Sequence, residues 1–133
     1  MFHSRVVGSN LRRILIPIDH VTDPQLAVDT ASSLAKILKR KKITFVLLYV
    51  GGKSKVPKVK TNKRKGWIWE VISCKGNIVN KIIEQENVHS SDLIIMTTQC
   101  REGFLGALRA STVERVFHNS NCPVLTIPDN HKH

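Results

Sequence analysis

The sequence has few of the residues that mark secreted or metal-bound proteins. It contains 3 cysteines in 133 residues, and no two of them have the spacing of a metal knuckle or a redox pair. An odd, low count argues against a disulfide framework and suits a reducing compartment. The 6 histidines form no HExxH motif or other ligand cluster. We therefore expect no bound metal.

Long apolar runs and catalytic motifs are missing as well. No run reaches the length of a membrane span, and the first residues, MFHSRVVGSNLRR, lack the apolar centre of a secretory signal. No GxSxG elbow, P-loop lysine pattern or paired-carboxylate motif occurs, so no catalytic residue is assigned. We expect a cytoplasmic protein without a membrane span, and the sequence leaves open whether it is an enzyme.

Acidic residues are absent from one long stretch of the chain. None lies between Asp29 and Glu70, whereas twelve of the 21 lysines and arginines lie within residues 36–65. The net charge of +11 is therefore concentrated in one region. Such a field attracts polyanions through counterion release and steers acidic partners.

What the chain does have is a regular alternation of apolar runs and amphipathic segments. Strands are expected in RRILIPID (residues 12–19), ITFVLLYV (43–50), WIWEVIS (67–73), 93–96 and 124–127. Helices are expected over 23–40, over 76–87 and from 111 onward. The first opens with Asp23 as a cap and Pro24 at the first helical position. Five strands with helical crossovers predict one doubly wound α/β domain over residues 1–133.

The last third of the chain is the most informative, SDLIIMTTQCREGFLGALRASTVERVFHNSNCPVLTIP. Leu93 to Met96 is apolar throughout, as in a parallel strand buried on both faces. Ser111 is followed three residues later by Glu114, which is the spacing of a helix capping box. Another apolar strand follows Pro123. This strand, helix and strand predict a right-handed parallel crossover.

This segment resembles the C-terminal part of universal stress proteins. In that family a strand ending in Met-Gly leads into a glycine loop, a Gly-Ser helix start and a Cys-Pro-Val strand. The resemblance extends from Arg13 to Pro128. It implies a UspA-like, adenine nucleotide alpha hydrolase-like fold, with a five-stranded parallel sheet in the order 3-2-1-4-5 and helices on both faces. Ligands of such sheets bind beyond the carboxyl ends of the strands, where the winding reverses.

The ATP-binding motif of the family is degenerate in this sequence. The motif is glycine, two residues, glycine, nine residues, and then glycine followed by serine or threonine. Its three glycines fall on Thr97, Cys100 and Ala110, and only Ser111 is retained. Glycine lets the backbone approach a triphosphate and take up positive φ angles, which a β-branched threonine tolerates worst. The sequence therefore predicts the loss of ordinary ATP binding.

Other positions match the family, so a nucleotide site with ATP or AMP as its ligand is the alternative. The resemblance places Pro17, Asp19 and Val50 against the adenosine part and Met96 on the floor of the crevice. An aspartate after a strand also commonly shapes a turn, which is the alternative role of Asp19. The candidate nucleotide-binding residues are Pro17, Asp19, Val50, Met96, Thr97, Cys100, Arg101, Ala110, Ser111 and Thr112.

A basic segment, GGKSKVPKVKTNKRKG, stands where family members usually have a helix. Residues 51–66 are too rich in lysine, glycine and proline to form a packed helix, so we expect a flexible basic loop. Its partner would be a polyanion or an acidic protein, and a solvated charged face is the alternative. Trp67 and Trp69 follow on one side of a strand, either to stack on bases or to pack within the protein. The candidate polyanion-binding residues are Lys58, Lys60, Lys63, Arg64 and Lys65.

The final strand bears on assembly. Relatives commonly pair this strand across a two-fold axis, and CPVLTIP is an apolar edge bounded by prolines. We expect a homodimer through residues 122–128, with a proline-guarded monomer as the alternative.

Three functions remain open: a stress-related regulatory or interaction domain without ordinary ATP binding, an adenine-nucleotide module with slow ATP hydrolysis, and a polyanion binder.

Overall fold

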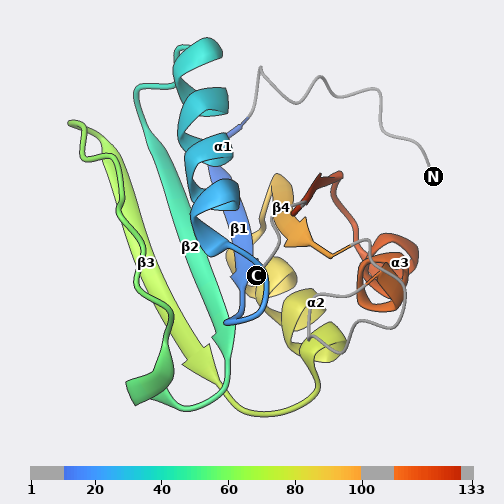
Figure 1. Ribbon diagram of the computed structural model, residues 1–133. Coiled ribbons are helices and arrows are strands. Elements are labelled where there is room, and N and C mark those ends of the chain that lie inside the picture. Colours follow the sequence, from blue (N-terminus) through green and yellow to red (C-terminus); the bar gives the residue numbers. More distant parts are fainter. Residues whose placement is uncertain (1–10, 100–109, 130–133) are drawn as a thin grey trace.

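The computed structural model describes residues 11–99 and 110–129. Within them, five strands form one parallel sheet, and three α-helices flank it (Figure 1). The strands are β1 (Arg13–Ile18), β2 (Ile43–Val50), β3 (Trp67–Cys74), β4 (Leu93–Thr98) and β5 (Val124–Pro128). The helices are α1 (Pro24–Ile37), α2 (Ile78–His89) and α3 (Ala110–Asn119).

The strand order in the sheet is β3-β2-β1-β4-β5, and every neighbouring pair is parallel. The predicted order 3-2-1-4-5 is therefore confirmed. The winding reverses between β1 and β4, because β2 and β3 extend the sheet on one side and β4 and β5 on the other. The carboxyl ends of β1 and β4 form the switch point at which ligands of such sheets bind.

Two apolar layers hold the helices on opposite faces of the sheet. Side chains alternate along each strand, so Ile14 and Ile16 of β1 face α1, while Leu15 faces the other side. The layer around Leu15 includes Val79 of α2 and Val116 of α3. Both layers contain side chains with no measurable exposure, which is why the central strands read as continuous apolar runs.

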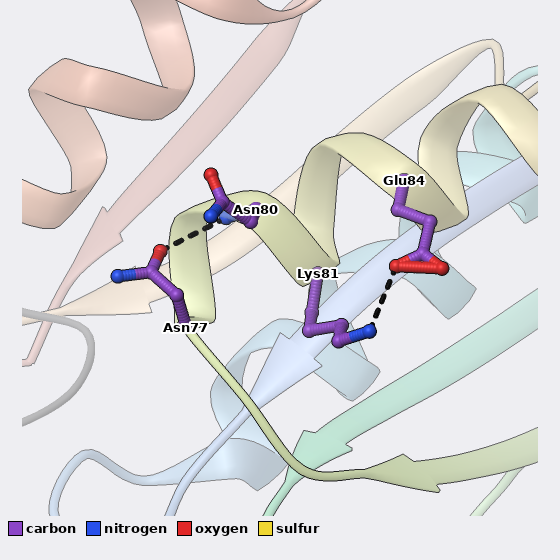
Figure 2. Close-up of polar contacts among 4 residues, drawn as sticks. All are labelled: Asn77, Asn80, Lys81 and Glu84. Carbon is purple, nitrogen blue, oxygen red and sulfur yellow. Dashed lines mark hydrogen bonds and ion pairs between the residues drawn. The ribbon is translucent and has the colours of Figure 1, made fainter.

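The helix starts follow local capping chemistry where the sequence provides it. The carboxylate of Asp23 accepts the Gln25 amide at 2.9 Å, and Pro24 opens α1, as predicted. At α2, Oδ1 of Asn77 accepts the Asn80 amide at 3.1 Å (Figure 2). One turn further, Nζ of Lys81 lies 3.0 Å from Oε2 of Glu84, and this exposed pair spans three residues of the helix (Figure 2).

The start of α3 differs from the prediction. Ser111 lies within α3, which is described from Ala110 onward, so Ser111 is not the residue that precedes the helix. The predicted capping box was therefore wrong. Glu114 lies instead within reach of His118 on the exposed helix surface, with 3.9 Å between Oε1 and Nε2. The spacing identified a helix correctly but not the residue that caps it.

The connection between β2 and β3 contains one short 3-10 helix, Lys53–Lys55, and no packed helix, as expected from its composition. It then runs back beside β3 to the start of that strand (Figure 1). Val56 and Val59 pack on the α1 layer of the core. The side-chain amide of Gln25 on α1 pairs with the backbone of Lys60, with both bonds 2.8 Å long. The flexibility of residues 51–66 stays a prediction.

The two tryptophans that follow this segment are part of the core. Trp69 stacks on Phe45 with ring centroids 3.9 Å apart, and Trp67 lies 5.2 Å from the same ring. Their indole nitrogens donate to the backbone oxygens of Asn62 and Arg40. Both side chains lie on one side of β3, as predicted. Because their faces and donors are already engaged, packing and not base stacking is their role.

Within residues 11–99 and 110–129, no helix is long and apolar enough to cross a membrane. The same part of the chain contains no cluster of three or more histidine, cysteine, aspartate or glutamate side chains that could hold a metal ion.

Candidate functional site

The carboxyl edge of the sheet is the predicted ligand site, and Asp19 lies at its centre. Asp19 follows β1 and is 6% exposed. Its Oδ1 accepts the amides of Val21 at 3.1 Å and Thr22 at 2.8 Å, and also the Thr22 hydroxyl at 2.8 Å. The carboxylate thus shapes the turn between β1 and α1, which is the alternative role foreseen for it.

A second buried carboxylate closes the same edge. Asp129 directly follows β5 and is 2% exposed. Its Oδ2 accepts the Asp23 amide at 2.8 Å, and its own amide donates to the Thr98 carbonyl at 2.8 Å. These bonds join the ends of β4 and β5 to the start of α1. Both carboxylates are therefore part of the contacts that hold the turn before α1 at this edge.

The connection between β2 and β3 covers part of the crevice beyond β1. A cavity of about 420 Å³ lies there, and Asp19, His20, Pro24 and residues 54–58 line it. His20 Nε2 contacts the Lys55 carbonyl oxygen, and its ring meets Tyr49 edge-on at 5.4 Å. His20 therefore joins the loop to the wall of the crevice.

Thr97, which the resemblance aligns with the first motif glycine, lies inside a strand. β4 continues to Thr98, two residues beyond the predicted end, and Thr97 pairs with Ile127 of β5. Thr97 is 1% exposed, and its hydroxyl oxygen has no hydrogen-bond partner in the described part of the chain. Met96 has no measurable exposure and packs in the α2 and α3 layer. Neither side chain is accessible to a ligand in this arrangement.

The remaining candidate positions are only partly gathered. Pro17 is buried within β1, and Val50 ends β2 half-buried. Of the helix residues, Ser111 is exposed, whereas Thr112 is 6% exposed. Ala110 is the first residue of α3. Cys100 and Arg101 lie outside the described residues.

The five candidate polyanion-binding residues follow the connection between β2 and β3. Lys58 lines the cavity at the carboxyl edge, beside Asp19. The backbone of Lys60 is bound to α1. Arg64 lies over the Trp67 ring, 5.3 Å from its centroid, next to the start of β3. The basic segment therefore carries charge from the carboxyl edge to the start of β3, and polyanion binding by these five residues stays a prediction.

Sequence reasoning missed a basic cleft at the opposite, amino edge of the sheet. Its lining includes four cationic residues, Arg12, Arg13, Arg40 and Lys42. A signal for it was present, because basic residues precede each of three strands that are neighbours in the predicted order. Parallel strands begin at the same edge, so these residues had to meet there.

A polar region with a buried carboxylate lies beside that cleft. Glu86 is 3% exposed, and its Oε2 accepts the Asn121 amide at 2.8 Å. Desolvation raises the pKa of the nearby Cys122 thiol well above its usual range, and the negative charge of Glu86 adds to the effect. The thiol therefore stays protonated and packs as an apolar group next to the α2 and α3 layer.

A model of the universal stress protein family matches residues 53–128, more than half of the chain. The chain belongs to the universal stress protein family. The match covers most of the basic segment and extends to the end of β5. A comparison with curated proteins found no significant match.

Solved structures of universal stress proteins share the fold at low identity. The chain resembles universal stress protein UspA from Lactobacillus plantarum with a TM-score of 0.58 and 18% identity, covering 88% of this chain and 97% of that one. For the universal stress protein from Archaeoglobus fulgidus the values are 0.58 and 13%, covering 87% and 93%. For the hypothetical protein MJ0577, the subject of a structure-based assignment of biochemical function, they are 0.67 and 17%, covering 92% and 99%.

Proposed function

We propose that this universal stress protein domain acts as a regulatory or interaction module that does not bind ATP in the ordinary way. The observation that carries the proposal is Thr97, a β-branched residue buried within β4 at the position of the first motif glycine. A triphosphate loop that began there would need the backbone freedom of glycine. We further propose that the protein is cytoplasmic and takes part in a stress response, as its family membership suggests.

Polar groups at the carboxyl edge support the same proposal. Asp19 and Asp129 already accept backbone amides of the turn before α1. Residues 54–58 line the crevice in which adenosine would lie. A nucleotide would have to displace these contacts, and each lost hydrogen bond to a charged group costs about 1.5–3 kcal/mol.

The alternative is an adenine-nucleotide module with slow hydrolysis, and a restored glycine motif distinguishes the two. Calorimetric titration with magnesium ATP should give no saturable binding for the natural chain and measurable binding for the triple variant Thr97→Gly, Cys100→Gly and Ala110→Gly. The single variant Cys100→Gly is the control, because it leaves Thr97 in the strand. Saturable one-per-chain binding by the natural chain would contradict the proposal.

The proposed module is a homodimer that pairs through residues 122–128. β5 is an edge strand, and Leu125 on it is 40% exposed. Sedimentation should give twice the chain mass, and Leu125→Lys should give the monomer mass. Val88→Lys is the control, because Val88 is 68% exposed and belongs to α2 and not to the edge strand β5. A natural chain with the monomer mass would exclude the dimer.

A second candidate function is polyanion binding, and the clustering of positive charge favours it. The net charge is +11, and no acidic residue interrupts residues 30–69. Binding by counterion release predicts an affinity that falls steeply with salt. Neutralising Lys58, Lys60, Lys63, Arg64 and Lys65 together should reduce that affinity if the loop is the contact surface. An unchanged affinity would mean that the polyanion binds to another surface of the protein.

A further inference from the structure

A cleft lies at the amino edge of the sheet, away from the carboxyl edge at which ligands of such sheets bind. Its volume is about 570 Å³, and it lies at the starts of β1, β2 and β3, opposite the carboxyl-edge crevice. The lining residues are Arg12, Arg13, Arg40, Lys42, Ile43, Thr44, Gly66 and Ile68. Half of them are cationic, and no acidic residue from the described part of the chain is among them.

The cleft is built by specific backbone contacts. Nε of Arg40 donates to the Leu11 carbonyl at 3.0 Å, so this half-buried guanidinium is held at the floor by one nitrogen and has two others for a ligand. The Arg12 and Arg13 amides both donate to Oδ2 of Asp92, at 2.9 and 3.0 Å. Asp92 therefore fixes the backbone on which these two arginine side chains stand.

Gly66 closes the cleft on the side of β3. Its φ is +85°, and a Cβ there would lie 2.1 Å from the Lys41 carbonyl oxygen. Glycine is therefore required for this close approach. The Ile43 amide also donates to the Gly66 carbonyl at 3.1 Å. These contacts place the basic residues before β2 beside Arg64 and Lys65, which precede Gly66.

Among residues 11–99 and 110–129, no acidic side chain forms an ion pair with Arg12, Arg13, Arg40 or Lys42. Glu86 and Asp92 line a neighbouring cavity together with Arg12 and Arg13, on the side away from Lys42. Like charges held in one cleft repel, and a bound anion would remove that repulsion. Lys41, Arg64 and Lys65 continue the positive charge along the same edge, so the charged surface is longer than a single phosphate group requires.

We propose that this amino-edge cleft binds the phosphate backbone of a nucleic acid, independently of base sequence. A repeating phosphate chain matches a line of cations contributed by three strand starts, and arginine side chains pair with phosphate in bidentate geometry. The aromatic rings nearby offer no stacking platform, since Trp67 is 8% exposed and Trp69 is stacked on Phe45. Contacts therefore go to phosphates and not to bases.

This proposal rests on the polyanion function proposed above and assigns it to a different surface from the loop. The test measures binding of a fluorescein-labelled duplex of mixed sequence over a range of salt concentrations. The test variant is Arg12→Gln, Arg13→Gln and Lys42→Gln, which keeps Arg40 and its bond to Leu11. The control is Lys53→Gln, Lys58→Gln and Lys60→Gln, which removes the same charge from exposed loop positions.

The natural chain should bind with a steep salt dependence. The test variant should bind more weakly, and the slope of log affinity against log salt should fall in magnitude by about 2.7, or roughly 0.9 for each lost phosphate contact. The control should keep most of the natural slope. Adding Arg40→Gln should lower the slope again, and circular dichroism confirms that each variant is folded.

Three results would overturn the proposal, and they differ in what else they affect. Equal losses in test and control variants would leave a polyanion binder without a dedicated cleft. No binding by the natural chain would remove the polyanion function itself and leave the proposed regulatory domain untouched. Tighter binding to phosphatidylserine vesicles than to the duplex would assign the cleft to a membrane surface, to which the 54%-exposed Ile68 would contribute.

Discussion

The two edges of the sheet use charged groups in opposite ways. At the carboxyl edge, Asp19 and Asp129 are buried and accept backbone amides, so their charge serves the fold. At the amino edge, Arg12 and Lys42 are exposed and have no acidic partner among the described residues. The edge at which this fold usually binds ligands therefore contains structural carboxylates, and Lys55 and Lys58 line the same crevice. At the other edge, the charged residues that line the cleft are all cationic.

The largest expected effect is at Asp19. Asp19→Ala removes the acceptor of two amides and a buried hydroxyl, so we expect the free energy of unfolding to fall by about 3 kcal/mol. Urea denaturation measures this. Asp19→Asn keeps one oxygen acceptor and should cost less. A loss below about 0.5 kcal/mol for Asp19→Ala would show that the carboxylate is not structural, and the contrast between the edges would fail.

A smaller loss is expected at Asp129. Asp129→Ala removes the acceptor of the Asp23 amide, and we expect a loss of about 1–2 kcal/mol in urea denaturation. Asp29→Ala is the matched control, because Asp29 carries the same charge on an exposed part of α1. Equal effects of the two substitutions would mean that net charge, and not the buried contact, determines stability.

The Cys122 thiol predicts a dependence on alkaline pH. The raised pKa means that the folded chain keeps this proton at pH values where the thiol of the unfolded chain ionises. Stability should therefore fall as the pH rises above the ordinary thiol value of about 8.5. The fall should be shallower in Cys122→Ala. Parallel curves for the two proteins, measured by denaturation between neutral and alkaline pH, would contradict a raised pKa of this half-buried thiol.

The smallest effect on stability is expected at the amino edge. Arg12→Gln, Arg13→Gln and Lys42→Gln together should change the free energy of unfolding by no more than about 0.5 kcal/mol, or should raise it, because they relieve repulsion. Thermal denaturation checks this directly. A loss as large as that of Asp129→Ala would mean that these side chains serve the fold, and the two edges would then be alike.

Much of this architecture could be predicted from local sequence, whereas the surfaces could not. Asp23 and Pro24 define the start of α1 because their capping contact spans only two residues. β4 runs past Met96 to Thr98 because pairing with β5 extends it, and that pairing is not local. Similarly, the loop and α1 are joined by the Gln25 contact to Lys60, 35 residues away. Such long-range contacts decide which polar groups remain available.

The basic cleft illustrates the same limit. Arg13 and Arg40 lie 27 positions apart in the sequence, and only the parallel sheet places them together. Counting charge along the chain pointed to the loop, because consecutive lysines are prominent there. Combining the predicted strand order with the basic residues before each strand would have pointed to the amino edge.

We propose above that this universal stress protein domain lacks the ordinary ATP site of its family motif. Calorimetric titration of the natural chain with ATP, ADP and AMP, with and without magnesium and at low and high salt, tests it most directly. We predict no saturable one-per-chain binding that persists at high salt. Such binding, if it is also weakened by Asp19→Asn in a folded protein, would contradict the account and establish an adenine site without the motif glycines.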